Sequence, residues 1–278
     1  MSPGCALAVD LGPEVDEPRR HPKLESSVHG RGEPSAHQLM AVVEYDGTDY
    51  LGFQIQRRGK TIQGEIERAL TSVTQQQTRV VGAGRTDAGV HASGQVIHFT
   101  AMWKHSLSDL LRALNAVLPE DIAIRELRWA PEGFHARYSA RSREYVYTIY
   151  NDTMRSPLLA RYSYHYPGTL DADAMDSACA CLVGRHDFLP FGWPARGDNT
   201  VRTVLGADCR RTGDLIRIRI EADAFLRQMA RRMVGNLLLV GRGELSVQGF
   251  AALLSLTERR TPAVGAPPQG LCLVKVNY

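Results

Sequence analysis

Strand-like and helix-like runs are interspersed along this chain, and their order constrains the fold more than any other feature. Runs with the two-residue periodicity or β-branched content of strands lie at residues 39–45, 80–81, 95–99, 122–129, 143–150, 201–210, 215–222 and 271–278. Helical spacing occurs at residues 61–77, 106–118, 171–182, 225–240 and 247–256. Because a strict strand–helix–strand alternation is missing, the order predicts an α+β fold with a mostly antiparallel sheet flanked by helices.

The first 37 residues differ in composition from the rest of the chain. They hold four basic and six acidic side chains and no aromatic residue. Such a segment cannot bury enough apolar surface to offset the entropy of ordering, so residues 1–37 are predicted to be a disordered extension. The remaining chain is predicted to form two α+β lobes, residues 38–140 and 141–278.

Several classes of protein are disfavoured by composition. No apolar stretch approaches the roughly 20 residues that span a bilayer, and the first 12 residues lack the basic and apolar regions of a secretory signal. The five cysteines are an odd number without Cys-x-x-Cys spacing, which indicates neither a disulfide framework nor a zinc site. A reducing cytoplasm is therefore the expected compartment.

Basic side chains are concentrated toward the C-terminus. The net charge is +3, yet residues 201–278 hold 12 basic and six acidic side chains. Only four of the 33 basic residues are lysines, and the planar guanidinium of arginine suits phosphate and base recognition. A preference for arginine codons is an alternative explanation of that excess.

The segment between residues 82 and 91 is the strongest candidate for chemistry. Its three glycines allow a ligand to approach the backbone closely, and it carries Arg85, Asp87 and His91. An aspartate beside an arginine tends to stay ionised, and a fixed carboxylate can attack or stabilise a sugar carbon. The alternative is a surface turn held by a structural Arg–Asp pair.

Other chemistries fit the residues less well. A metal site built from Asp87, His91 and His98 lacks the spacing of a helical zinc motif. Neither a Gly-x-Ser-x-Gly elbow nor a glycine-rich phosphate loop occurs, so no metal and no nucleotide cofactor are expected.

The segment Gly84-Arg-Thr-Asp-Ala-Gly-Val-His-Ala92 resembles the signature of the tRNA pseudouridine synthase A family. Further segments resemble the family's motifs in the same order, and together they cover residues 38 to 278. They are Glu44–Gln54, Thr61–Glu65, Asn115–Ile122, Phe134–Ala140, Arg143–Tyr147, Ala224–Gly235 and Gly270–Tyr278.

The resemblance implies a two-lobed pseudouridine synthase fold with an RNA-binding cleft between the lobes. It also implies a homodimer that isomerises uridines 38, 39 and 40 in the anticodon arm of tRNA without a cofactor. Asp87 corresponds to the catalytic aspartate, and Tyr145 to the active-site tyrosine. Arg85 is assigned to hold Asp87 or to fill the space left by the flipped base.

Helical spacing supplies one further candidate. At 100° per residue, Arg227 and Arg231 would lie together at the edge of an apolar stripe, so Arg231 could reach a buried carboxylate or phosphate. His91 is expected to order the loop. Contacts with the tRNA backbone are expected from Gln54, Gln56, Arg57, Arg58, Lys60 and Arg227. The alternative is that these side chains are simply solvated.

Two alternatives to a uridine isomerase remain at this stage. One is a catalytically silent RNA-binding protein on the same scaffold, and intact Arg85, Asp87 and Tyr145 argue against it. The other is a glycosyl hydrolase, which would need a second carboxylate that the loop does not supply.

Overall fold

A computed structural model describes residues 36–195, 197–258, 261 and 264–278. The predicted N-terminal extension overlaps these residues only at Ala36 and His37, and otherwise lies outside them. In the described part of the chain, no helix is long and apolar enough to cross a membrane.

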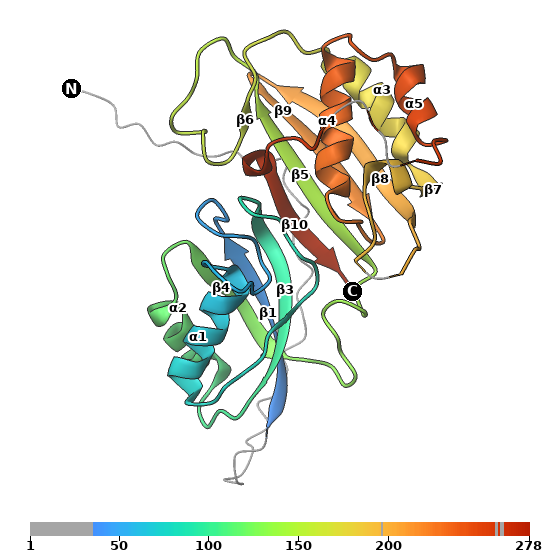
Figure 1. Ribbon diagram of the computed structural model, residues 1–278. Helices are drawn as coiled ribbons and strands as arrows, with labels where there is room; N and C mark the ends of the chain where they lie inside the picture. The colour runs from blue at the N-terminus through green and yellow to red at the C-terminus, as the bar shows by residue number, and fades with distance from the viewer. Residues whose placement is uncertain (1–35, 196, 259–260, 262–263) are drawn as a thin grey trace, which may run out of the picture. The chain divides into compact units, whose positions relative to one another are not determined.

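A ten-stranded sheet runs through the described residues, in the order β4-β1-β3-β10-β5-β9-β8-β7, with β2 beside β3 and β6 beside β5 (Figure 1). Its pairs are antiparallel except β10–β3 and β5–β6. The strands are β1 His37–Tyr45, β2 Val81–Gly82, β3 His91–Ala101, β4 Ile122–Trp129, β5 Ser142–Tyr150, β6 Tyr164–His165, β7 Gly184–Asp187, β8 Val201–Thr212, β9 Leu215–Ala222 and β10 Leu271–Asn277.

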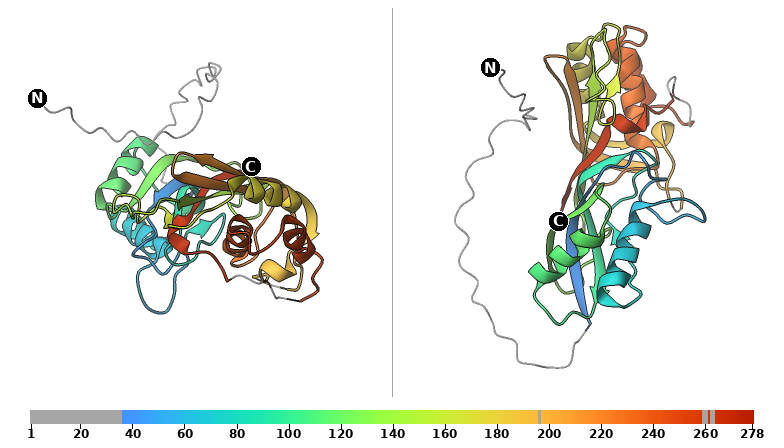
Figure 2. Two further views of the ribbon diagram at one scale, coloured as in Figure 1. Left: turned by 90° about the horizontal axis from the view of Figure 1, so that it is seen from above. Right: turned by 90° about the vertical axis from the view of Figure 1, so that its left-hand side faces the viewer.

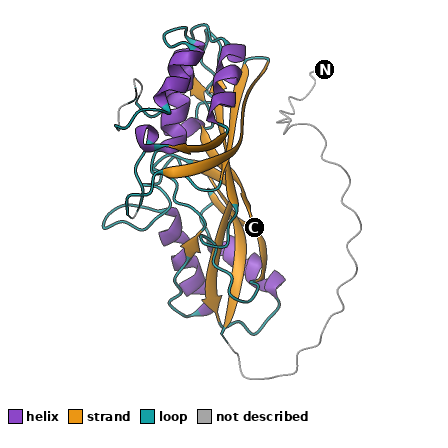
Figure 3. Cartoon of the chain, turned by 90° about the vertical axis from the view of Figure 1, so that its right-hand side faces the viewer, coloured by secondary structure: helices purple, strands orange, loops and turns teal. Residues whose placement is uncertain are grey.

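Helices form two groups along this sheet, and loops fill the interval between the groups (Figure 3). One group accompanies β1, β3 and β4 and consists of α1 (Ile62–Thr74) and α2 (Leu107–Val117). The other accompanies β8 and β9 and consists of α3 (Ala172–Leu182), α4 (Met229–Gly241) and α5 (Val247–Leu253). The predicted α+β class with a mostly antiparallel sheet and flanking helices is confirmed.

The last strand connects the two halves of the sequence. β10 pairs with β3 on one side and β5 on the other, so the sheet is continuous from residues before 140 to residues after it (Figure 2). The loop between β2 and β3 therefore lies near the middle of the strand order, next to segments from the second half of the chain.

Apolar spacing and capping residues explain the helices. In α1, Ile62, Ile66 and Leu70 are fully buried, as the helical spacing predicts. Side chains of the predicted N-terminal residues accept backbone N–H groups, namely Thr61 from Gly64 and Asp171 from Ala174. The sequence predicts these helix starts because a capping side chain bonds to a backbone N–H only three residues away.

The capping box at α2 gives a stability prediction. The Ser106 hydroxyl accepts the Asp109 N–H, and the Asp109 carboxylate accepts the Ser106 N–H. Ser106→Ala should lower the free energy of unfolding by about 1 kcal/mol, measured by urea denaturation. The exposed Ser72 inside α1 is the control, because Ser72→Ala removes no cap. Equal stability of Ser106→Ala and the unmodified protein would contradict the prediction.

The prediction for α4 is wrong at its beginning. The helix begins at Met229 rather than near Phe225, because Gln228 has a left-handed backbone (φ 62°) that no α-helix accommodates. Arg227 forms an extended bridge with Trp193 instead, and its N–H donates to the Trp193 carbonyl at 2.9 Å. The last predicted helix is also shorter, ending at Leu253.

Candidate active site

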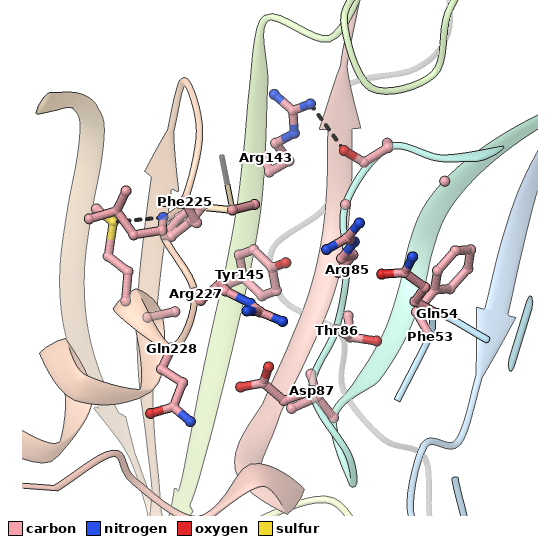
Figure 4. Close-up of a pocket in the computed structure, with 18 of the residues that line it drawn as sticks. Phe53, Gln54, Arg85, Thr86, Asp87, Arg143, Tyr145, Phe225, Arg227 and Gln228 are labelled. Atoms are coloured by element: carbon pink, nitrogen blue, oxygen red, sulfur yellow. Dashed lines mark hydrogen bonds between the residues drawn. The ribbon is translucent and has the colours of Figure 1, made fainter. Parts of the chain in front are cut away.

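A cavity of ≈ 830 Å³ opens between the β2–β3 loop, β5 and the segment 224–231 (Figure 4). Its size is within the range of about 300–1,000 Å³ that is usual for small-molecule sites. Of the predicted site residues, it is lined by Gln54, Arg85, Asp87, Tyr145, Arg227 and Arg231. The structure thus brings together residues that lie up to 177 positions apart in the sequence.

The charge on the walls of this cavity is strongly one-sided. A single carboxylate, that of Asp87, lines it in the described part of the chain. The basic residues on its walls are Arg85, Arg137, Arg143, Arg202, Arg227 and Arg231. Six guanidinium groups around one carboxylate favour an anionic ligand.

Hydrogen bonds on both sides of Asp87 fix its position. The Thr86 carbonyl accepts the Phe53 N–H at 3.1 Å, and the hydroxyls of Thr86 and Tyr45 lie 2.8 Å apart. The Asp87 carbonyl accepts the Val90 N–H at 3.2 Å, which closes a turn. The carboxylate consequently extends from a fixed backbone into the cavity (Figure 4).

A glycine at position 52 permits this close arrangement, and a buried glutamine holds the loop at Gly84. A Cβ at Gly52, whose φ is +94°, would lie 2.6 Å from the Thr86 carbonyl oxygen. Gly84 is held by the fully buried Gln95, whose amide donates to the Gly84 carbonyl at 2.9 Å and accepts its N–H at 3.3 Å. Of the three glycines in the 82–91 segment, Gly89 alone has a positive φ.

Arg231 forms an ion pair with Asp87. Its Nη1 lies 3.3 Å from the Asp87 Oδ2, and its Nε donates to the Ala266 carbonyl at 2.7 Å. The side chains are 19% and 42% exposed, so the carboxylate stays open to a ligand while the guanidinium is anchored behind it.

Arg227 lines the same cavity, but it does so from a loop and not from the predicted helix. The helical-wheel argument that grouped it with Arg231 is wrong, because Arg227 precedes the helix. Its exposed side chain points into the cavity from the loop before α4 (Figure 4).

Tyr145 stands in the wall of the cavity on β5. Its ring is 8% exposed, and the ring of Phe225 packs edge-on against it with centroids 4.9 Å apart. Burial raises the pKa of Tyr145, so its hydroxyl keeps its proton at physiological pH. The tyrosine can therefore serve as a flat apolar surface with a protonated donor at its edge.

Buried tyrosines make the fold sensitive to alkali. Burial raises the pKa of Tyr45, Tyr145 and Tyr147 above the value of about 10 that they have when unfolded. Stability is then intact below pH ~10 and falls as the pH rises further, by about 1.4 kcal/mol per pH unit for each tyrosine. Urea midpoints measured at increasing pH should show this decline, and Tyr147→Phe should make it shallower. A midpoint that stays constant well above pH ~10 would rule the explanation out.

Some of the other predicted residues line the cavity, and others do not. Arg85 is exposed and lines the same cavity as Tyr145 (Figure 4). Residues of the exposed loop after Gln54 do not all reach the cavity: Gln56 lines it, whereas Arg57, Arg58 and Lys60 do not.

His91 and His98 take part in separate structural contacts. The Nδ1 of His91 accepts the Gly47 N–H at 3.1 Å, and its Nε2 lies 3.2 Å from the Gln269 carbonyl, so it ties the loop to neighbouring segments. The Nδ1 of His98 accepts the Ala136 N–H. No group of three histidine, cysteine or acidic side chains in the described residues is placed to hold a metal ion.

Sequence reasoning did not single out Arg143. Its guanidinium is buried and donates to four backbone carbonyls, those of Ala83, Arg137, Ala140 and Asp223, at 2.6–3.4 Å. It thereby links the loop of Asp87 to the strand of Tyr145 and to the segment that leads to Phe225. Nothing in the local sequence distinguishes it from an exposed arginine at the start of a strand.

Comparison with known proteins identifies the family of the chain. The profile of the tRNA pseudouridine synthase family matches residues 41–139 and 178–278. The chain is 45% identical to the tRNA pseudouridine synthase A of Roseiflexus castenholzii over 240 residues, 85% of this chain and 88% of that protein. It is 41% identical to that of Geobacter sp. strain M21 over 242 residues, 86% of this chain and 98% of that protein. The chain therefore belongs to the tRNA pseudouridine synthase A family, whose members are isomerases that convert uridine to pseudouridine in tRNA.

Proposed function

We propose that this protein isomerises uridines 38, 39 and 40 in the anticodon stem-loop of tRNA, with Asp87 as the catalytic carboxylate. The observation that carries the proposal is the setting of Asp87. Among the described residues, its carboxylate is the single acidic group that lines the cavity. It forms an ion pair with Arg231 at 3.3 Å, and Tyr145 lines the same cavity.

The reaction needs no group beyond those that the site offers. The C1′–N1 bond of the uridine breaks, the base turns, and a C1′–C5 bond forms. The proton on C5 is lost and N1 gains a proton, so substrate and product have the same atoms. One carboxylate suffices because no water attacks, which distinguishes this site from that of a glycosyl hydrolase.

Asp87 has two chemically reasonable roles in the first step. It can attack C1′ and form a covalent adduct with the sugar, or it can accept a proton from C2′ and give a glycal. Both roles require an ionised carboxylate, and the Arg231 guanidinium 3.3 Å away compensates its negative charge. We leave both routes within the proposal.

The neighbouring side chains supply binding and positioning. Tyr145 offers its ring to the base and its protonated hydroxyl to proton movement near C5. Arg85 fills the space that the extruded base leaves in the RNA, at the point where a few kcal/mol of stacking are lost. We further assign tRNA backbone contacts to Gln54, Arg57, Arg58, Lys60 and Arg227.

The remaining family properties complete the proposal. Asp87 and Tyr145 approach the cavity from residues before and after position 140, which supports an RNA-binding cleft between lobes 38–140 and 141–278. The family resemblance supports a homodimer acting in the cytoplasm.

Position mapping tests the proposed substrate. Purified protein is incubated with tRNA transcripts carrying uridine at 38, 39 or 40 singly, and pseudouridine is located by chemical labelling and primer extension. Product at these positions and at no other uridine is expected. Product confined to another region of the tRNA would overturn the assignment while leaving the isomerase activity in place.

A further inference from the structure

Tyr138 is an exposed aromatic residue that directly follows a residue of the cavity wall, and the catalytic scheme above does not use it. It lies in the loop between β4 and β5, and 73% of its surface is exposed. The preceding residue, Arg137, lines the cavity. An exposed aromatic side chain normally has no contacts that fix its orientation, whereas a neighbouring side chain packs against this one.

One face of the Tyr138 ring is covered by an imidazole. The rings of His135 and Tyr138 are stacked, with centroids 4.3 Å apart and an interplanar angle of 30°. The His135 Nδ1 accepts the N–H groups of Arg137 and Tyr138, both at 3.2 Å. The imidazole also packs on His98, with centroids 4.8 Å apart. The tyrosine ring is therefore held in one orientation before any ligand arrives.

The Arg137 guanidinium lies over the Tyr138 ring, with its carbon 5.8 Å from the ring centroid, at the outer limit of a cation–π contact. The residue is nevertheless 73% exposed, so this contact leaves the ring accessible. In the part of the chain that the structure describes, Arg137 has no ion pair with a carboxylate. An exposed aromatic ring with a cation over it that is uncommitted to a carboxylate suits a ligand that is both flat and negatively charged.

Tyr138, His135 and Arg137 together are called the platform here, and hydrogen bonds link this platform to the loop of Asp87. The Arg143 guanidinium donates to the Arg137 carbonyl at 2.6 Å and to the Ala83 carbonyl at 3.1 Å. One buried side chain thus fixes the spacing between the platform and the loop of Asp87.

We propose that Tyr138, backed by His135 and flanked by Arg137, is a second base-binding position, where an unpaired nucleobase of the RNA stacks beside the reacting uridine. The proposal rests on the proposed function, since it concerns the same RNA. Base stacking on aromatic side chains is tolerant of sequence, so such a position serves several target uridines equally well. Arg137 would bind the phosphate of the stacked nucleotide.

The test uses RNA hairpins with the anticodon-arm sequence, in which 2-aminopurine replaces one unpaired base at a time. Binding is measured with Asp87→Asn protein so that no turnover occurs. At one position we expect fluorescence quenching that Tyr138→Phe retains and Tyr138→Ala loses. In otherwise unmodified protein, Tyr138→Ala should raise KM about tenfold, a typical value for one stacked base, and leave kcat unchanged.

The matched control is Trp129→Ala, which removes an aromatic ring of similar exposure (51%) from the edge strand β4. It should change neither quenching nor KM. Unchanged KM and quenching in Tyr138→Ala would overturn the proposal, as would an equal loss in Tyr138→Phe. An altered oligomeric state with unchanged RNA affinity would overturn it too, and would assign the ring to a subunit interface.

These readouts separate this proposal from the proposed function. If the unmodified protein forms no pseudouridine, the catalytic assignment fails, yet quenching can still be read because it needs no turnover. If pseudouridine forms and Tyr138→Ala behaves like the unmodified protein, the platform alone is refuted.

Discussion

Asp87→Asn is expected to lower kcat for pseudouridine formation by at least about a thousandfold, as loss of an essential catalytic group does in other enzymes. The amide keeps the shape of the side chain but can neither attack C1′ nor accept a proton from C2′. Affinity for tRNA should be retained, because the basic residues of the cavity are intact and one negative charge has been removed. Single-turnover formation of pseudouridine and filter binding measure the two quantities.

A second aspartate provides the control. Asp49 also pairs with an arginine, Arg161, at 3.1 Å, but it is 66% exposed and lies outside the cavity lining. Asp49→Asn should leave kcat and tRNA affinity unchanged. Appreciable turnover by Asp87→Asn, with the control fully active, would mean that another group performs the chemistry.

The other large effect is expected at Arg143. Arg143→Met keeps the length of the side chain but leaves four backbone carbonyls without their donor. We expect a loss of about 2–4 kcal/mol in unfolding free energy, since hydrogen bonds to charged groups are worth more than neutral ones. A displaced Asp87 loop should also lower kcat about a hundredfold, because misplacement by an ångström has effects of that size.

Conservative variants and a neighbouring arginine show whether the effect comes from positioning. Arg143→Lys restores the charge and up to three donors, so it should recover part of kcat. Arg219→Met removes a 38%-exposed arginine that pairs with Asp208 on the next strand, and it should cost at most about 1 kcal/mol with kcat unchanged. If Arg143→Met were as active as the unmodified protein at a temperature where both are folded, Arg143 would have no positioning role.

Local sequence signals located most elements because their causes are local. The capping side chains of Thr61, Ser106 and Asp171 mark the starts of three helices within one residue. Alternation of apolar residues gave β4 and β9 exactly as the structure has them. The short strands β6 and β7 were missed, since two and four residues are too few to establish a period.

Tertiary contacts decided what local signals could not. Residues 225–228 have helical composition, but Arg227 forms a β-bridge with Trp193 and Gln228 has a left-handed backbone, so α4 begins only after them. The three glycines in the loop of Asp87 indicated that its backbone could adopt many conformations. Its bonds to Phe53, Tyr45 and Gln95 come from distant segments and fix it in place.

The sequence by itself determined the fold class, the starts of α1, α2 and α3 and the motif that carries Asp87, because these depend mainly on residues within a few positions of one another. Only the tertiary structure paired Asp87 with Arg231, 144 positions away, and gave Arg143 its four carbonyls. Such partners are chosen by strand order and packing: β10 brings the two halves of the chain into one sheet, and no local pattern encodes that adjacency.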